Sequence, residues 1–384
     1  MIELEPAATA PTVLDAPFTY RQALHETRKT RRHLLLGNGF SMAYDRNLFS
    51  YENLAAAGGE PDQTVRDLLS EKAGDIEAAI IVLLQRRGFA VDEGELEKAE
   101  ALALQIGELK EHLIRAVTAV HPGSAFDVEV DRKAQCCNFL KPYIGRSAIP
   151  HGIVFTTNYD LLLYWTLVAH AIFRSRGDVL CWDGFKGEDW VPKVMQHVNM
   201  SAVYLHGALH LHNHGNGIKR IMYQMGAVNL NLITQIRMRL DQNEFPIFVA
   251  EGDSSTKLRR ISGNPYLSAA FDKFKFACKE GDSALFVIGH RLAKQDEHLS
   301  DQIGKGRIGT VYFGAYGGAG SEDARNAEKL AARWAGQRAD TPWKAPLTVK
   351  VFDSRECEIW HPQGKEMLAL GGMSEALNTC GAHL

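Results

Sequence analysis

The sequence lacks an excess of positive charge. Its 384 residues include 43 lysines and arginines against 46 aspartates and glutamates, which gives a formal net charge of −3. A protein that binds nucleic acid through its phosphates normally needs a basic surface. We therefore do not expect nucleic acid as a partner. With 45% hydrophobic and 23% charged residues, the composition is that of a globular protein, long enough for two domains or for one large domain with an insertion.

Paired cysteines are also lacking. None of the six cysteines stands in a C-x-x-C pair, the spacing that most zinc modules and thiol redox sites need. They are Cys136, Cys137, Cys181, Cys278, Cys357 and Cys380. We expect reduced, buried thiols that hold no metal, as is usual in a cytoplasmic protein.

The sequence has no apolar run that is long enough to cross a membrane. The longest candidate, residues 152–173, is interrupted by Asn158 and Asp160, whereas a spanning helix needs about 20 nearly uninterrupted apolar residues. The first twenty residues lack the basic start and the continuous apolar core of a signal peptide. We therefore expect neither membrane insertion nor export, and a cytoplasmic location.

Short β-rich runs alternate with segments of helical length over much of the chain. Strands are expected at 33–36, 153–155, 202–205, 221–223, 246–249, 284–288, 310–313 and 347–352. Helices are expected at 161–173, 229–240, 265–279, 296–303 and 322–334. Strands separated by helices predict an α/β fold, with a Rossmann-like, mostly parallel sheet that is covered by helices on both faces.

One stretch of the chain interrupts this alternation. From about Asp62 to Leu140, the residues Asp, Glu, Lys, Ala and Leu dominate, with apolar positions at helical spacing, which predicts a helical insertion with turns near Gly88 and at 121–124. The expected division is a lead-in (1–30), a Rossmann-like domain (31–61 and 145–355), the insertion (62–144) and a tail (356–384). The insertion is a candidate surface for self-association.

The first predicted strand runs into a glycine-containing loop and the start of a helix. This loop consists of Gly37, Asn38, Gly39, Phe40 and Ser41. In such a loop, backbone N–H groups and the helix dipole can bind a pyrophosphate. The third glycine of the usual dinucleotide fingerprint is absent, however, so an ordinary tight turn also explains the pattern.

Polar side chains follow the next convincing strand. Thr156, Thr157, Asn158 and Asp160 stand at its carboxyl end, the edge of an open α/β sheet where ligands bind. The Asn158 amide offers both a donor and an acceptor, which suits a water molecule or a sugar hydroxyl. Asp160 either caps the following helix or contacts a ligand.

Two further strand ends carry histidines. His206 lies in an L-H-G sequence and should project from the same sheet edge as Asn158, although a single histidine there is often structural. Gly289 and His290 follow an apolar strand, and the glycine permits close backbone approach to a ligand. We predict that these strand ends share one pocket.

Three alternating histidines follow His206. The spacing of His210, His212 and His214 is compatible with metal binding on one strand face. No carboxylate or cysteine joins them, and the letters HNHGNG are typical of a hairpin tip. We expect no metal there, and a position away from the pocket.

In this order the motifs resemble the sirtuin-like NAD-binding family. G-N-G-F-S stands where that family has a Gly-Ala-Gly-x-Ser loop, and T-T-N-Y-D where it has Thr-Gln-Asn-x-Asp. L-H-G matches the family's His-Gly, and I-G-H-R-L stands, more loosely, at its later Gly-x-Ser-Leu. The resemblance extends over about residues 31–355 and implies a Rossmann-like fold that binds NAD.

The resemblance also implies roles for individual residues. Asn158 would bind the nicotinamide ribose and its water, and His206 would act in catalysis at the ribose hydroxyls. The glycine loop would hold the pyrophosphate, with Ser41 and Asp160 supporting the pocket. Thr156, Thr157, Gly289 and His290 complete the set of expected NAD contacts.

The sequence departs from the family in two places. Segment 44–54, with Phe49 and Tyr51, stands where the family has a mobile cofactor-binding loop, but it lacks the Gly-Ile-Pro-x-Phe-Arg pattern. The two Cys-x-x-Cys pairs of protein-deacylating sirtuins are missing, and a helical insertion precedes T-T-N-Y-D. This arrangement resembles the bacterial branch whose members hydrolyse NAD in defence against phage. Residues 245–267 also resemble an uncharacterised bacterial family of that branch.

The expected function is therefore that of a NAD⁺ glycohydrolase, with NAD as the substrate and no metal. Hydrolysis needs binding, orientation and one delivered water, because nicotinamide leaves as a neutral molecule. An ADP-ribosyl transferase or deacylase of the same fold, and a sensor that binds NAD or ADP-ribose without cleaving it, are the alternatives. Since an unregulated NAD hydrolase would poison its own cell, we expect control through a homo-oligomer or a regulatory partner.

Overall fold

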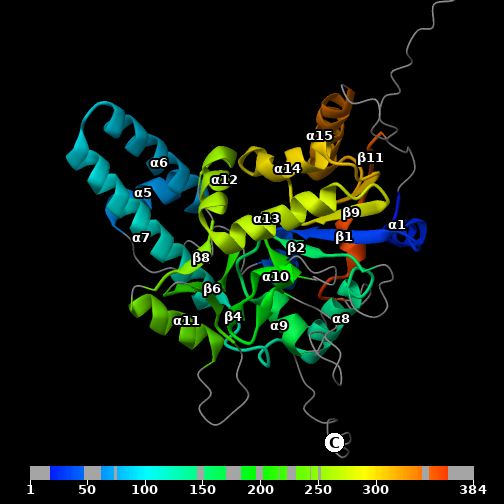
Figure 1. Ribbon diagram of the computed structural model, residues 1–384, viewed down its shortest axis with the longest axis horizontal. Helices are drawn as coiled ribbons and strands as arrows, with labels where there is room; N and C mark the ends of the chain where they lie inside the picture. Colours follow the sequence, from blue (N-terminus) through cyan, green and yellow to red (C-terminus); the bar gives the residue numbers. More distant parts are fainter. Residues whose placement is uncertain are drawn as a thin grey trace, which may run out of the picture.

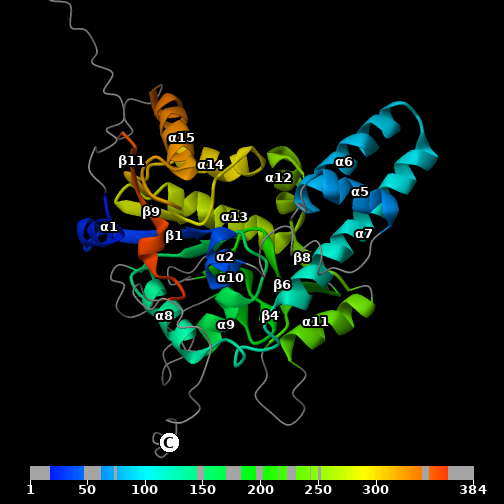
Figure 2. The ribbon, with the colours of Figure 1, turned by 180° about the vertical axis from the view of Figure 1, so that it is seen from behind.

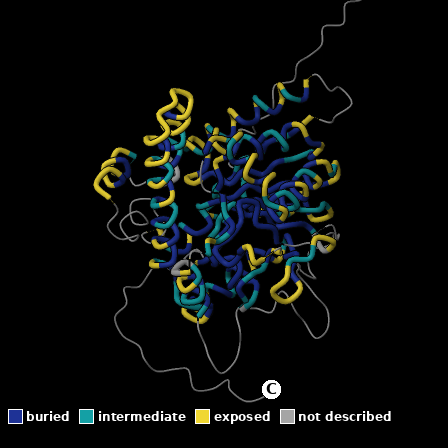
Figure 3. The backbone as a smooth tube through the Cα atoms, turned by 60° about the vertical axis from the view of Figure 1, so that its left-hand side comes forward, coloured by how far each residue is buried: buried dark blue, intermediate teal, exposed yellow. Residues whose placement is uncertain are grey.

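A computed structural model describes most of the chain. The described residues are 18–46, 62–72, 76–144, 151–169, 183–195, 202–215, 217–222, 231–242, 244–249, 252–339 and 346–361. Most of the expected loop segment 44–54, including Phe49 and Tyr51, lies outside them, as do Cys181 and Cys380. Figure 3 shows that the buried residues are concentrated in the centre of the molecule.

A six-stranded sheet organises the molecule, in the order β11-β10-β9-β1-β2-β5, and each neighbouring pair is parallel. Its strands are β1 (Arg31–Leu36), β2 (Val154–Thr156), β5 (Ala202–Tyr204), β9 (Ser283–Ile288), β10 (Thr310–Ala315) and β11 (Thr348–Asp353). Every residue of β9 is buried, because helices cover both faces of the sheet. The predicted α/β, Rossmann-like fold is confirmed.

Helices pack on the two faces of this sheet (Figures 1 and 2). On one side lie α13 (Pro265–Cys278), α14 (Glu297–Lys305) and α15 (Glu322–Ala339), and on the other lie α8 (Val130–Leu140) and α9 (Leu162–Ala169). Phe155 of β2 contacts Phe274 of α13, with ring centres 5.1 Å apart. Phe286 of β9 contacts Tyr143, which follows α8, at 5.2 Å. The predicted helices are present, whereas α12 (Ser254–Gly263) was not predicted.

A second sheet corrects one expectation. Residues 185–248 contribute a five-stranded antiparallel sheet in the order β3-β4-β7-β6-β8. Its strands are β3 (Phe185–Lys186), β4 (Asp189–Trp190), β6 (Gly207–His214), β7 (Gly217–Arg220) and β8 (Pro246–Phe248), and α10 (Pro192–Met195) and α11 (Leu232–Asp241) accompany them. The strand expected at 221–223 was wrong, because β7 ends at Arg220, residues 221 and 222 belong to no strand, and residue 223 lies outside the described residues. The strand expected at 246–249 is present as β8, but it belongs to the antiparallel sheet and not to the parallel one. Only two residues separate β6 from β7, whereas a parallel connection needs a dozen residues or more.

The insertion is helical, as predicted. It contains α5 (Gln63–Glu71), α6 (Ile76–Asp92), α7 (Leu96–Val120) and α8, and the α6–α7 hairpin projects from the body of the molecule (Figures 1 and 2). The turn at 121–124 is confirmed, since α7 ends at Val120. The turn near Gly88 is wrong: this residue lies inside α6, and the chain reverses after Asp92, with Gly94 at a φ of +77°. None of the described helices could span a membrane.

The expected lead-in and tail both contribute to the core. α1 (Tyr20–Glu26) begins at a capping box formed by Thr19 and Gln22. The Tyr20 ring packs against Phe352 of β11, with ring centres 5.4 Å apart. Beyond η2 (Ser354–Cys357), Trp360 is 1% exposed and donates Nε1–H to the backbone oxygen of Phe40 at 2.9 Å. Large aromatic side chains at both ends thus extend the core past the boundaries expected at 30 and 356.

Gly152 lies against neighbouring backbone, whereas Gly88 faces open space. We therefore predict that alanine has opposite effects on stability at the two positions. A Cβ at Gly152 would lie 1.6 Å from the backbone oxygen of Arg32, so Gly152→Ala should cost about 3 kcal/mol or more of unfolding free energy. A Cβ at Gly88, inside α6, meets nothing within 4 Å, so Gly88→Ala should stabilise by up to about 1 kcal/mol. Urea unfolding of both variants measures this, and equal effects would contradict the packing described here.

Candidate functional site

A cavity of about 1050 Å³ opens at the carboxyl edge of the parallel sheet. The ends of β9, β1 and β2 lie side by side there, because Leu36 is in register with both Ile288 and Thr156. The lining includes predicted residues from all four strand ends: Asn38, Gly39, Thr157, Asn158, Asp160, His206, Gly289 and His290. The four strand ends therefore meet at one pocket, as predicted.

Glycines let two of the loops touch backbone to backbone. A Cβ at Gly39 would lie 2.5 Å from Gly289 Cα, and a Cβ at Gly37 would lie 2.5 Å from Gly289 O. Gly289 has a φ of +67°, which glycine adopts without strain. The Gly39 N–H donates to Gly289 O at 2.9 Å. The glycines therefore serve first to pack the loop after β1 against the loop after β9.

This packing uses most of the N–H groups that were expected to bind a pyrophosphate. The N–H groups of Gly37, Gly39, Phe40 and Ser41 all donate to backbone oxygens at 2.9–3.2 Å. Among the described residues, none accepts a hydrogen bond from the Asn38 N–H. The loop therefore offers a ligand close approach and one backbone donor, at the start of the short helix α2 (Gly39–Tyr44).

Four predicted contact residues do not line the cavity: Gly37, Phe40, Ser41 and Thr156. Phe40 is 1% exposed and packs on Trp360, with ring centres 5.1 Å apart. Thr156 Oγ1 accepts the Asn158 N–H at 3.0 Å, which fixes the loop after β2. These residues hold the wall of the site from behind.

The Asn158 side chain is held in one orientation. Its Nδ2 group donates to Gly37 O and to Ser41 Oγ, both at 3.0 Å. Both donors of the amide are thereby used, which leaves Oδ1 as the atom that can serve a ligand. The sequence suggested that both a donor and an acceptor of Asn158 could serve a ligand, but in the structure only the acceptor, Oδ1, remains available for one.

Asp160 supports the asparagine and caps a helix. Its Oδ2 accepts from Ser41 Oγ at 2.5 Å, and its Oδ1 accepts the Leu162 N–H at the start of α9 at 2.9 Å. Burial raises the pKa of this carboxyl, while the hydrogen bonds from Ser41 and Leu162 oppose the rise. The capping alternative is confirmed, and the residue also reaches the cavity wall. Thr157 is fixed through its N–H, which donates to Leu36 O at 3.0 Å.

The helical insertion reaches the site at the end of α7. Leu113 and Val117 line the cavity. His121, which follows α7, is buried, and its Nε2 accepts the Leu161 N–H at 3.0 Å, directly beside the Asn158 loop. Burial lowers the pKa of His121 to about 4, so the ring is neutral near pH 7 and free to accept this bond.

His206 stands at the corner between the two sheets. It lies in the two-residue link from β5 to β6, it is 3% exposed, and its backbone oxygen accepts the Val249 N–H at 2.8 Å. The next residue, Gly207, has a φ of +81°, and a Cβ there would lie 2.0 Å from Ile247 O. Glycine is therefore required for the turn that points His206 into the cavity wall.

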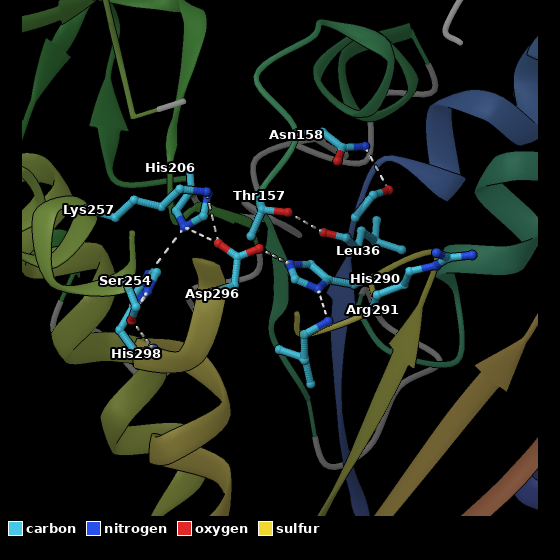
Figure 4. A network of polar contacts seen from close by, with 12 residues as sticks. Leu36, Thr157, Asn158, His206, Ser254, Lys257, His290, Arg291, Asp296 and His298 are labelled. Carbon is cyan, nitrogen blue, oxygen red and sulfur yellow. Dashed lines mark hydrogen bonds and ion pairs between the residues drawn. The ribbon is translucent and has the colours of Figure 1, made fainter. Parts of the chain in front are cut away.

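A polar cluster surrounds His206 (Figure 4). Its Nε2 lies 3.3 Å from His298 Nε2 and 3.9 Å from Asp296 Oδ1. Lys257 Nζ lies 3.1 Å from the same Asp296 oxygen, and His290 Nε2 lies 3.8 Å from the other one. Lys257 comes from α12, Asp296 from η1 (Lys294–Asp296) and His298 from α14. Figure 4 shows Asn158 apart from this cluster, near Leu36.

Burial and charge set the protonation of the cluster. Burial, followed by Lys257, lowers the pKa of His206 well below its usual value. Burial also lowers the pKa of His290, and it lowers that of His298 to about 4. Burial alone would raise the pKa of Asp296, but Lys257 and the two nearest histidines outweigh it and hold the pKa well below the usual range. The resting cluster thus contains one ion pair and neutral imidazoles.

The cluster has the donor atoms of a metal site but is already occupied by a cation. Ligand atoms of His206, Asp296 and His298 lie within 4.8 Å of one another, the one such group found in the described part of the chain. The Lys257 ammonium, however, takes the Asp296 carboxylate and would repel a divalent ion. The donor set therefore fits an ion pair better than a metal.

The alternating histidines His210, His212 and His214 do not line the cavity. β6 and β7 form the predicted hairpin, and His214 is exposed near its tip. His210 and His212 are buried, and His210 stacks on Tyr164 with ring centres 4.4 Å apart. None of the three belongs to a metal-ligand group or to the cavity lining among the described residues.

The sequence did not indicate the polar side chains that surround His206. Ser254, Lys257, Asp296 and His298 were not among the predicted site residues, although a helix was expected to begin at residue 296. Lys257 is 2% exposed although it lies on a short, strongly polar helix, and no local pattern marks such a residue as buried. The one usable signal was the position of Asp296, shortly after the glycine that ends β9.

Basic and aromatic residues also line the cavity: Arg46, Arg291, Tyr316, Arg355, Trp360 and His361. Arg291 Nε contacts Asp323 Oδ1 at 2.9 Å, and Arg355 forms an ion pair with Asp353. Guanidinium groups recognise phosphate oxygens well, and aromatic faces suit a base. These lining residues can therefore receive a planar, anionic ligand.

One family matches the chain. The family described as "Domain of unknown function (DUF4917)" matches residues 34–360. This range includes the antiparallel sheet, the insertion, every residue of the cluster around His206, and all of the parallel sheet except the first three residues of β1. No curated protein matches the chain.

The neutral His121 generates a prediction about acid stability. Its pKa of about 4 in the folded state lies below the ordinary value of 6.5, so the unfolded chain binds more protons, and stability falls as the pH drops from about 6.5 towards 4. His121→Gln should lower stability at pH 7.5 through lost packing. It should also reduce the loss between pH 7.5 and pH 5 by about 2 kcal/mol. Urea unfolding at the two pH values measures the difference, and equal losses would show that His121 does not titrate on unfolding.

Proposed function

Because the chain belongs to the DUF4917 family, whose description assigns no function, we propose from the site that the protein is a NAD⁺ glycohydrolase, which cleaves NAD⁺ into ADP-ribose and nicotinamide. The observation that carries the proposal is the meeting of Asn158, His206 and the Gly37–Ser41 loop around one cavity. These are the residues on which the resemblance to sirtuin-like NAD-binding proteins rests. Ligands of open α/β sheets bind at this edge.

The reaction asks little of the protein chemically. The bond between ribose C1′ and the pyridine nitrogen breaks, and its electron pair stays on the nitrogen, so nicotinamide leaves neutral. A water oxygen bonds to C1′ and releases one proton. The protein must orient NAD⁺ and one water, exclude other water and accept that proton.

Asn158 and His206 are suited to these two tasks. The Asn158 amide is fixed by Gly37 and Ser41, so its Oδ1 can accept from a water or a ribose hydroxyl without reorganising. His206 is a neutral imidazole whose Nε2 faces His298 and Asp296. Its Nδ1, which has no partner among the described residues, is the atom left to accept the proton.

The shape and charge of the cavity support a dinucleotide. A volume of about 1050 Å³ is at the upper end for small-molecule sites. The basic residues of the lining suit the pyrophosphate, and Tyr316 offers an aromatic face. In this proposal NAD is the substrate, and no metal takes part in the reaction.

The biological setting is also a proposal. The resemblance to bacterial NAD-hydrolysing proteins suggests an effector that depletes NAD during phage infection, in the cytoplasm. Such an activity needs control, through self-association or a regulatory partner. The projecting α6–α7 hairpin is a candidate contact surface, since Phe89, Leu96 and Leu104 are each about 70% exposed on it.

Substitution of the two central residues tests the proposal. Asn158→Ala and His206→Ala should each lower nicotinamide release by about 100-fold or more, because each removes a positioned polar group. His214→Ala, an exposed histidine on the same strand as Gly207, is the matched control and should retain full activity. Nicotinamide and ADP-ribose are quantified by chromatography after incubation of pure protein with NAD⁺.

The products also separate the alternatives. Free ADP-ribose in equal amount to nicotinamide supports hydrolysis, whereas ADP-ribose attached to a protein or acyl acceptor indicates a transferase or deacylase. Binding of NAD⁺ without nicotinamide release, across monomeric and oligomeric fractions, indicates a sensor. Full activity in the folded Asn158 and His206 variants contradicts the proposed mechanism.

A chelator tests the absence of a metal. Because Lys257 already neutralises Asp296, EDTA or 1,10-phenanthroline should leave nicotinamide release unchanged within about twofold. Metal analysis of the same sample is the control. Loss of activity with chelator and recovery with zinc would place a metal among His206, Asp296 and His298 instead.

A further inference from the structure

A buried ion pair lies beside His206, and both of its residues also line the cavity. Lys257 Nζ and Asp296 Oδ1 are 3.1 Å apart, and their side chains are 2% and 12% exposed. The same oxygen lies 3.9 Å from His206 Nε2. An ammonium and an imidazole therefore compete for one carboxylate oxygen.

We propose that Lys257 is a positioning residue of this site: it occupies the Asp296 carboxylate and thereby keeps His206 neutral, in the form that can accept a proton. The role of His206 as a proton acceptor in catalysis rests on the proposed function. The effect of Lys257 on the ionisation of His206 is independent of that function and can be measured without any substrate.

The titratable groups that face His206 come from four parts of the chain. Lys257 lies on α12, Asp296 ends η1, His298 lies on α14, and His290 follows β9. Of these groups, Asp296 alone favours a protonated His206, since an opposite charge at this distance stabilises the charged form. Lys257 opposes it twice, through its own positive charge and through its hold on the carboxylate. Without Lys257, an unpaired buried carboxylate would take an imidazolium as its counter-ion.

Ser254 and His298 fix the direction of the proton on His206. Ser254 Oγ accepts the backbone N–H of His298 at 2.6 Å and lies 3.2 Å from its Nδ1. If the ring donates Nδ1–H to this oxygen, its Nε2 presents a lone pair to His206 Nε2–H, 3.3 Å away. His206 then leaves the lone pair of Nδ1 for the ligand. The proton from the attacking water would join Nδ1 and later pass to solvent, which restores the neutral ring.

Nuclear magnetic resonance of histidine side chains tests the inference directly. The full-length protein is labelled with ¹⁵N-histidine and titrated without NAD⁺, and His206→Gln assigns the signal. We expect His206 to stay neutral through pH 6 in the wild-type protein and in Lys257→Arg. In Lys257→Met, His206 should be protonated at that pH, because Asp296 has lost its cation. A His206 titration that is identical in all three proteins overturns the proposal.

Two further variants keep the test decisive if Lys257→Met does not fold. Asp296→Asn removes the one charge that favours protonation, so His206 should resist protonation to lower pH than in the wild-type protein. The double variant Lys257→Met/Asp296→Asn removes both charges and should return the titration towards the wild-type curve. A purely structural role for the pair predicts no opposed shifts and no compensation, and that result also overturns the proposal.

If the wild-type protein cleaves NAD⁺, the activity of the variants gives a second measurement. The ratio of nicotinamide release at pH 6 to that at pH 8 should fall about tenfold in Lys257→Met and recover in Lys257→Arg. Arg259→Met removes an exposed cation from the same helix and should not change the ratio. If the wild-type protein releases no nicotinamide, the proposed hydrolase function fails, while the NMR titration still decides the role of Lys257.

Discussion

Parallel pairing of the three central strands is the constraint on which the site depends. β1 pairs with β9 and β2 so that Leu36 lies level with Ile288 and Thr156. The three strands therefore end at the same level of the sheet, and the loops that follow them, from distant parts of the sequence, lie next to one another. Glycine at 37, 39 and 289 allows these loops to touch, because a Cβ at any of the three positions would meet backbone atoms at less than 3 Å.

The polar groups at this edge are satisfied across loops and not within them. Asn158 donates to Gly37 and Ser41, and Asp160 accepts from Ser41, so the loops after β1 and β2 hold one another. Lys257 and Asp296 join α12 to η1 in the same way. A buried polar group without a partner costs several kcal/mol, so each loop position requires the others. A site built like this is already organised before a ligand arrives, which is what a reaction that depends on orientation needs.

The additions to the parallel sheet also contribute to the site. The antiparallel sheet begins at Gly207, so His206 occupies the corner where the chain passes from one sheet to the other. The insertion supplies one wall of the cavity through Leu113 and Val117, and His121 anchors the start of the helix that follows Asn158. Both units therefore contribute to the site, because each positions or supplies residues that line the cavity.

The sequence by itself determined the α/β class, the helical insertion and the strand ends that bear Asn158, His206 and Gly289. Hydrophobic period and turn chemistry are local, and parallel strands place their carboxyl ends at one edge by rule. It did not determine the second sheet, the helical position of Gly88 or the burial of Lys257. A lysine on a polar helix has the same local pattern whether it faces water or a carboxylate. Only tertiary packing decided that α12 lies against η1, and with it which charge lies beside His206. The two partners are 39 residues apart, so no local sequence pattern predicts their contact.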